Sequence, residues 1–134
     1  MTQIINDFLE YVKKNEVYLL EVNKVLTKDI HGQSNETLKL YGSEVLAHRA
    51  RVVICLAKFN QDLDIATMDL LPDKTKSMSE IERKARVEKS VAAIRYWRDI
   101  CKGLTDTIDK RVSFIQTVLS YEKSHMGNLG SEVA

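Results

Sequence analysis

Apolar residues recur at alternating steps of three and four along most of this chain, which is the spacing of an amphipathic helix. The pattern predicts helices over about residues 2–27, 35–70 and 79–123. The first seam consists of Ile5, Phe8, Val12, Asn15, Leu19, Val22 and Leu26. The second consists of Leu38, Tyr41, Val45, His48, Val52, Cys55, Phe59 and Ala66. The third consists of Ile94, Trp97, Cys101, Leu104, Ile108, Arg111, Ile115 and Val118. Such heptad-like seams are typical of helices in bundles and coiled coils.

Two breaks separate these helices. Gly32 suits the turn after the first helix, and Ser34 suits the N-cap of the second. Pro72 ends the second helix, and Ser79 with Glu82 has the spacing of a capping box. The predicted fold is therefore all-α: a hairpin of two long antiparallel helices, with the N-terminal helix packed on it. We expect a single domain over residues 1–125 and a disordered tail over 126–134.

The amino-acid composition is consistent with a fold that contains few turns. The chain of 134 residues has 5 Gly and 1 Pro, too few for the many turns of a β-sandwich or an α/β fold. Heptads on all the predicted helices leave apolar surface uncovered, which favours self-association. Neither a leader-like N-terminus nor an apolar run near the ~20 residues of a membrane span is visible. We therefore expect a cytoplasmic protein with no membrane partner, located in an infected host cell if a phage encodes it.

No motif predicts catalysis. The histidines His31, His48 and His125 form no HExxH or Glu-x-x-His pair, and no CxxC or Walker A sequence occurs. Cys55 and Cys101 are interpreted as buried free thiols. We predict no catalytic residue, metal site or cofactor, and we do not expect an enzyme. An acidic cluster, formed by Asp62, Asp64 and Asp69, is expected to face solvent.

The third helix begins with a basic segment. Arg95, Arg98 and Lys102 share one face beside Tyr96 and Trp97. Cations with nearby aromatic rings suit single-stranded nucleic acid, whose phosphates need charge and whose bases stack on flat rings. In the alternative interpretation Trp97 belongs to the core, while neighbouring carboxylates neutralise the arginines. The second helix adds another basic group, centred on Arg49 and Arg51.

The residues Ile94, Arg95, Tyr96, Trp97, Cys101, Leu104, Asp106, Ile108, Arg111 and Phe114 carry a family resemblance. This segment resembles the C-terminal helix of the UvsY-type recombination mediators of bacteriophages. The resemblance covers residues 77–121 well and 38–60 loosely. It implies a ring-like, coiled-coil homo-oligomer that acts in DNA recombination and DNA repair. Such a protein binds single-stranded DNA, helps displace single-strand-binding protein and loads a RecA-like recombinase.

The resemblance also implies roles for particular residues. The DNA-binding residues would be Arg49, Arg51, Lys58, Arg83, Lys84 and Arg86. The oligomerisation residues would be Tyr96, Trp97, Cys101, Leu104, Ile108, Arg111 and Ile115. Because an unpaired charge in an apolar seam is costly, Arg111 is expected to reach an acid across the interface or to emerge at its rim. The alternative function is a non-enzymatic helical interaction module, such as a phage-encoded inhibitor or assembly adaptor, with no affinity for nucleic acid.

Overall fold

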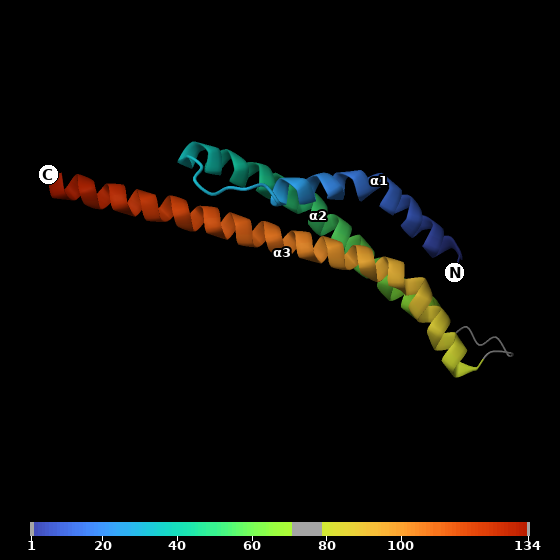
Figure 1. The fold of residues 1–134 in the computed structure, drawn as a ribbon. Coiled ribbons are helices and arrows are strands. Elements are labelled where there is room, and N and C mark those ends of the chain that lie inside the picture. The colour runs from blue at the N-terminus through green and yellow to red at the C-terminus, as the bar shows by residue number, and fades with distance from the viewer. Residues whose placement is uncertain (1, 71–78, 134) are drawn as a thin grey trace.

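The computed structural model describes residues 2–70 and 79–133, and this part of the chain contains helices and no strand. Helix α1 spans Thr2–Leu26, α2 spans Asn35–Leu70 and α3 spans Glu80–Val133. The prediction of an all-α protein is confirmed. The helices form an elongated bundle, with α1 and α2 lying along α3 and the C-terminal end of α3 extending beyond them (Figure 1).

The helix starts follow from local side-chain chemistry. The Ser34 hydroxyl accepts a hydrogen bond of 3.2 Å from the Thr37 backbone N–H, which satisfies a free donor in the first turn of α2. At the start of α3, the Ser79 hydroxyl does the same for the Glu82 N–H, also at 3.2 Å. Gly32 has a φ of 74°, in the left-handed region that glycine adopts without strain. The linker around Pro72 lies outside the described residues.

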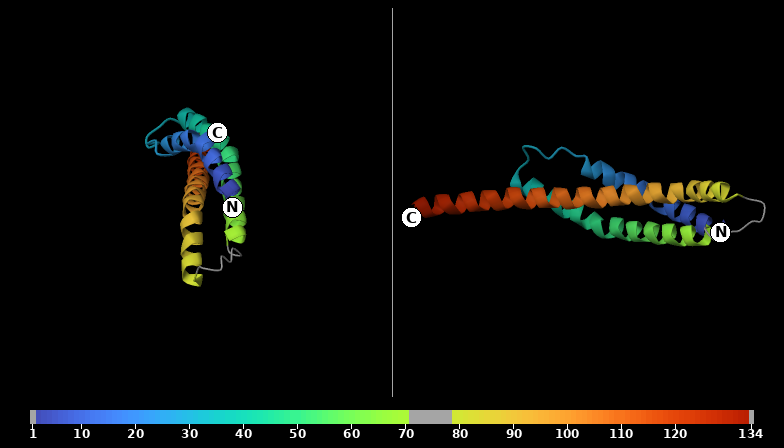
Figure 2. Two further views of the ribbon diagram at one scale, coloured as in Figure 1. Left: turned by 90° about the vertical axis from the view of Figure 1, so that its right-hand side faces the viewer. Right: turned by 90° about the horizontal axis from the view of Figure 1, so that it is seen from below.

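Helix α3 continues beyond its expected end. The pattern predicts an end near residue 123, because Gly127 and Gly130 follow, but the helix runs to Val133. Isolated glycines weaken a helix without terminating it, and no proline occurs in this segment. The C-terminal end of α3 consequently projects past the start of α2 (Figures 1 and 2). The disorder expected for residues 126–134 stays a prediction.

Helices α2 and α3 run in opposite directions along a long contact (Figure 2). The Asn35 amide donates a hydrogen bond of 3.1 Å to Glu122, near the start of α2. Further along, Arg49 contacts Asp109 at 2.8 Å. The register is therefore constant, since the residue numbers rise along one helix as they fall along the other.

Helix α1 packs on α2, again in the opposite direction. The Phe8 and Phe59 rings meet edge to face, with centroids 5.8 Å apart. Near the other end of α1, the Tyr41 hydroxyl donates a hydrogen bond of 2.7 Å to the Val25 carbonyl. Between these contacts, the Tyr18 hydroxyl and the His48 ring nitrogen are 2.7 Å apart. Consecutive helices thus pair with each other, and α1 runs parallel to α3.

One continuous apolar core connects the helices. Its buried members are Phe8, Val12, Leu19, Val22, Leu26, Ile30, Leu38, Tyr41, Val45, Val52, Cys55, Phe59, Ala66, Val91, Ile94, Cys101, Leu104, Ile108 and Ile115. Both cysteines are buried free thiols. Burial, with a smaller contribution from the neighbouring Cys55, raises the pKa of Cys101 to about 12. Cys101 is therefore protonated at neutral pH and packs as a small apolar side chain.

Gly103 provides a test of local helix stability. A Cβ added at Gly103 meets no atom within 4 Å, whereas Gly32 has the φ of 74° that disfavours any L side chain. We expect Gly103→Ala to stabilise the protein by about 1 kcal/mol, because alanine costs less backbone entropy in a helix. The matched control, Gly32→Ala, should destabilise it. Urea unfolding of both variants checks the prediction, and a loss of stability in Gly103→Ala contradicts it.

Candidate nucleic-acid interface

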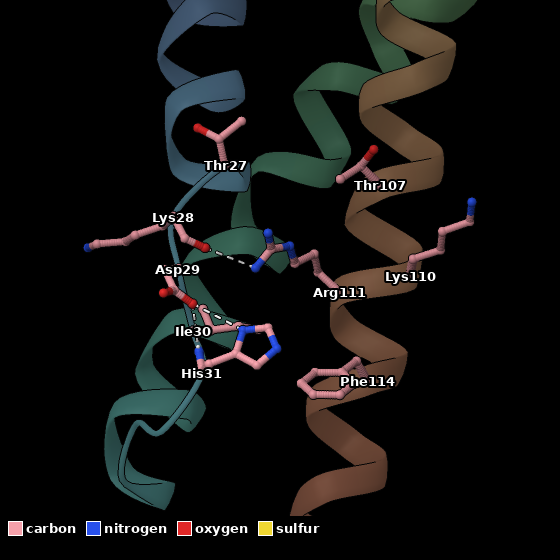
Figure 3. A pocket seen from close by; sticks show the side chains of 9 residues that line it. All are labelled: Thr27, Lys28, Asp29, Ile30, His31, Thr107, Lys110, Arg111 and Phe114. Atoms are coloured by element: carbon pink, nitrogen blue, oxygen red, sulfur yellow. Dashed lines mark hydrogen bonds and ion pairs between the residues drawn. The ribbon is translucent and has the colours of Figure 1, made fainter.

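A pocket of about 590 Å³ lies where the loop after α1 meets α3 (Figure 3). Its lining residues are Thr27, Lys28, Asp29, Ile30, His31, Thr107, Lys110, Arg111 and Phe114. The loop supplies one wall and α3 supplies the other. Three of these residues are cations at neutral pH and one is a carboxylate, so the pocket carries a positive charge. This chemistry suits an anionic ligand.

Arg111 ties α3 to the end of α1. Its guanidinium donates a hydrogen bond of 3.0 Å to the Lys28 backbone carbonyl, and Figure 3 shows the side chain crossing from α3 toward the loop. A cation placed just after the last turn of a helix also opposes the partial negative charge of its C-terminus. Within the single chain this carbonyl holds the half-buried guanidinium. That Arg111 reaches an acid across an oligomer interface, or emerges at its rim, stays a prediction.

The loop itself is held by Asp29. The Asp29 carboxylate accepts a hydrogen bond of 3.0 Å from the His31 backbone N–H and lies 3.1 Å from the His31 ring nitrogen. The backbone hydrogen bond, followed by the side-chain contact, lowers the pKa of Asp29. The contact fixes the direction of the loop, so that the His31 ring faces α3 in Figure 3.

An exposed aromatic ring completes the pocket. The Phe114 ring, 49% exposed, points from α3 toward the loop that carries His31 (Figure 3). Lys28 and Lys110 are exposed and extend away from the centre on opposite sides of the pocket. Neither lysine forms an ion pair with a residue in the described part of the chain. The pocket therefore combines an exposed flat ring with two cations at its edges.

A second pocket of about 550 Å³ continues from the first along α1 and α3. The two share Thr27 and Thr107, so they adjoin, and together they are called the groove below. At the far end of this groove lie Tyr96 and Trp97, whose rings pack edge to face with centroids 5.7 Å apart. Tyr96 is exposed and Trp97 is half-buried. The groove therefore has aromatic side chains at both ends.

The structure places the predicted DNA-binding residues of α2 on different sides of the helix. Arg49 faces α3, where it donates two hydrogen bonds to Asp109, of 2.8 and 3.4 Å. This contact raises the pKa of Arg49 and lowers that of Asp109. Arg51 faces α1 instead, with its guanidinium carbon 3.7 Å from the centre of the Tyr18 ring and a hydrogen bond of 3.3 Å to Asn15. The two arginines thus support two helix contacts and share no surface.

Lys58 lies on the α1 side as well. Its ammonium is 2.7 Å from an Asp62 oxygen, and the Asp62 side chain is only 2% exposed. The expectation that Asp62 faces solvent with Asp64 is therefore wrong: Asp62 belongs to the buried face of α2, whereas Asp64 is exposed. The reason is helical geometry, since residues two apart point in directions about 200° apart.

The basic segment of α3 is partly neutralised. Arg95 contacts Glu88 at 3.0 Å, and Arg98 contacts Asp99 at 2.9 Å, as the alternative interpretation of this segment expects. Lys84 is exposed. The side chains of Arg83 and Arg86 lie outside the described part of the structure, so their DNA-binding role stays a prediction.

Most of the predicted oligomerisation residues belong to the core of the single chain. Cys101, Leu104, Ile108 and Ile115 are buried against the other helices. Tyr96, Trp97 and Arg111 line the groove described above. The role of this set in assembly stays a prediction, and in the single chain most of its surface is already covered.

Sequence reasoning did not single out Lys28 or Lys110. Lys28 follows α1 directly and Lys110 lies in α3, and no local spacing links two such distant positions. Within residues 2–70 and 79–133, no group of three His, Cys, Asp or Glu side chains is arranged to hold a metal ion. None of the helices in these ranges is long and apolar enough to cross a membrane.

Comparison of the chain with models of known protein families, with characterised protein sequences and with solved structures gives no match.

Proposed function

We propose that this protein is a non-enzymatic, single-stranded DNA-binding protein that acts as a recombination mediator. The observation that carries the DNA-binding part is an exposed ring, Phe114, in a pocket edged by Lys28 and Lys110, neither of which forms an ion pair with a described residue. Proteins that bind single strands without sequence preference combine aromatic stacking with cations that follow the phosphates. The second pocket adds the rings of Tyr96 and Trp97 for stacking, but its lining contains Glu16 and Asp99 and no lysine or arginine, so the phosphate contacts are assigned to the first pocket alone.

The test is fluorescence anisotropy of a labelled single-stranded oligonucleotide, measured over a series of salt concentrations. Removing Lys28 and Lys110 together (Lys28→Ala and Lys110→Ala) should weaken binding and reduce the salt slope by about 1.4, since each phosphate contact on a single strand contributes roughly 0.7. Phe114→Ala should weaken binding by about 1–3 kcal/mol, the usual cost of losing one base stack, and leave the salt slope unchanged.

A charge-matched variant controls for net charge. Lys13 and Lys14 are exposed on α1, away from the pocket, so their double alanine variant removes the same charge. It should reduce binding much less than the pocket variant. Equal loss in both variants would show that only bulk charge matters. No binding by the unmodified protein at low salt would exclude the DNA-binding proposal.

The mediator role is supported by the resemblance of residues 77–121 to the UvsY-type proteins. It includes homo-oligomerisation, a RecA-like recombinase and a single-strand-binding protein as partners. Recombinase ATPase activity on DNA already covered by single-strand-binding protein measures this role. We expect the chain to shorten the lag before ATP hydrolysis begins, and an unchanged lag would contradict the mediator role while leaving DNA binding intact.

The second candidate is a helical interaction module without nucleic-acid affinity. The internal pairing of basic side chains favours it: Arg49 with Asp109, Lys58 with Asp62, Arg95 with Glu88, and Arg98 with Asp99. A cation that already contacts a carboxylate gains less interaction energy when it binds a phosphate. The anisotropy experiment separates the two candidates, because this one predicts no binding even at low salt.

A further inference from the structure

Helix α2 has a third face that neither α1 nor the described part of α3 covers. Tyr41, His48 and Cys55, seven residues apart, face α1. Gly42 and Arg49 face α3. The positions one step before Tyr41, His48 and Cys55 point about 100° further around the helix, away from α3. At the start of α2, Leu40 lies beside the loop after α1, with which it lines a pocket of about 300 Å³. The outer face of α2 therefore carries Leu40, Ala47 and Ile54 in heptad spacing.

These outer positions are apolar and exposed. Leu40 is 74% exposed and Ile54 is 63% exposed. Ala47, Ala50 and Ala57 are also exposed and occupy the same side of the helix. We call these five residues the outer stripe. A helix of a soluble protein that is apolar on its outer face as well as toward its core is expected to have a further partner.

We propose that the outer stripe binds the outer stripe of a second copy of this chain, forming a parallel two-stranded coiled coil of α2 helices. Leu40, Ala47 and Ile54 have the spacing of a positions, and Ala50 and Ala57 that of d positions. The small alanines allow the two backbones to approach closely. The stripe carries no charge, so a copy of itself covers it without burying an unpaired ion.

Charged residues beside the stripe decide the direction. In a parallel pair, a g position faces the e position five residues later on the other helix, which places Lys39 opposite Glu44 of the partner subunit. Both side chains are exposed and free of ion pairs with other described residues. The parallel direction is therefore favoured.

The stripe also has a defined end. The position seven residues after Ala57 is Asp64, which is exposed. Two such carboxylates facing each other oppose close contact, so the seam extends from Leu40 to Ala57. This corresponds to about 27 Å of helix, a short seam that should give a concentration-dependent dimer. The inference does not depend on DNA binding, because the pocket near Arg111 lies at the junction of α1 and α3.

Analytical ultracentrifugation over a wide range of protein concentration tests the proposal. The unmodified protein should shift from monomer to dimer as concentration rises. Ile54→Glu should raise the dissociation constant by roughly tenfold or more, because it places one charge from each copy in the seam. The control is Val17→Glu on α1, where the native side chain is equally open, at 66% exposure. Circular dichroism confirms that both variants fold.

The direction is tested by cross-linking. In the parallel dimer, the Ala47→Cys variant brings its two introduced thiols together, so oxidation by copper phenanthroline should yield a covalent dimer. The native Cys55 and Cys101 are buried and serve as an internal background. A monomer at every concentration, or a dimer insensitive to Ile54→Glu, overturns the proposal. A dimer that does not cross-link overturns the parallel direction.

Discussion

Truncation of Phe59 to alanine is expected to lower the free energy of unfolding by roughly 3–5 kcal/mol, the usual cost of removing a buried phenyl ring. Phe59 is fully buried in α2. Its ring meets those of Phe8 and Tyr11 edge to face, with centroids 5.8 and 5.4 Å away. The substitution therefore removes both aromatic contacts and leaves a cavity between α1 and α2.

Urea unfolding followed by circular dichroism measures this loss. The control is Val17→Ala on the exposed side of α1, which should change stability by less than about 0.5 kcal/mol. A small effect at Phe59 would mean that α1 does not dock on α2 as described. A broad transition in the variant would show that α1 separates first, since Phe59 anchors the N-terminal end of that helix.

Removing the lysine that neutralises Asp62 is expected to have the second largest effect. The Lys58 ammonium lies 2.7 Å from one Asp62 oxygen, while the other oxygen is buried with no hydrogen-bond partner among the described residues. Lys58→Met leaves a buried carboxylate alone. Breaking a fully buried pair costs about 3–5 kcal/mol, and because Lys58 is itself 36% exposed we expect roughly 2–4 kcal/mol.

A double variant identifies the cause. Replacing Asp62 as well, in Lys58→Met with Asp62→Leu, removes the stranded charge and should recover most of the lost stability. Lys14→Met, at an exposed lysine of α1, controls for the loss of a surface cation. If the double variant is as unstable as Lys58→Met alone, the aliphatic stem of Lys58, and not its charge, provides the stabilisation.

The positions of the helices can be predicted from the sequence more reliably than the contacts of their side chains. Their starts were predictable because Ser34 and Ser79 form local caps that need no tertiary information. The end of α3 was not predictable, because glycines in the C-terminal segment indicate a helix end there, whereas the helix continues to Val133. Periodicity also missed the outer stripe, because alanines such as Ala47 give a weak apolar pattern beside the larger residues of the core.

The candidate site was less predictable for a physical reason. Basic residues of α2 looked available because their partners are far away in the sequence: Arg49 meets Asp109, sixty residues later. Arg51 covers the Tyr18 ring of another helix. The pocket around Arg111 likewise combines a loop with a distant turn of α3. Only the packing of the three-dimensional structure shows which cations are engaged and which remain free.

The pairing of consecutive helices has a consequence for the folding reaction. Helix α2 is shared by two hairpins, one with α1 through Tyr18 and His48, the other with α3 through Arg49 and Asp109. Each hairpin closes a single connection between neighbouring elements, so neither pairing requires the third helix to be in place first. Either hairpin can form first and offer α2 as a template for the remaining helix. Such a topology gives two parallel routes to one native state.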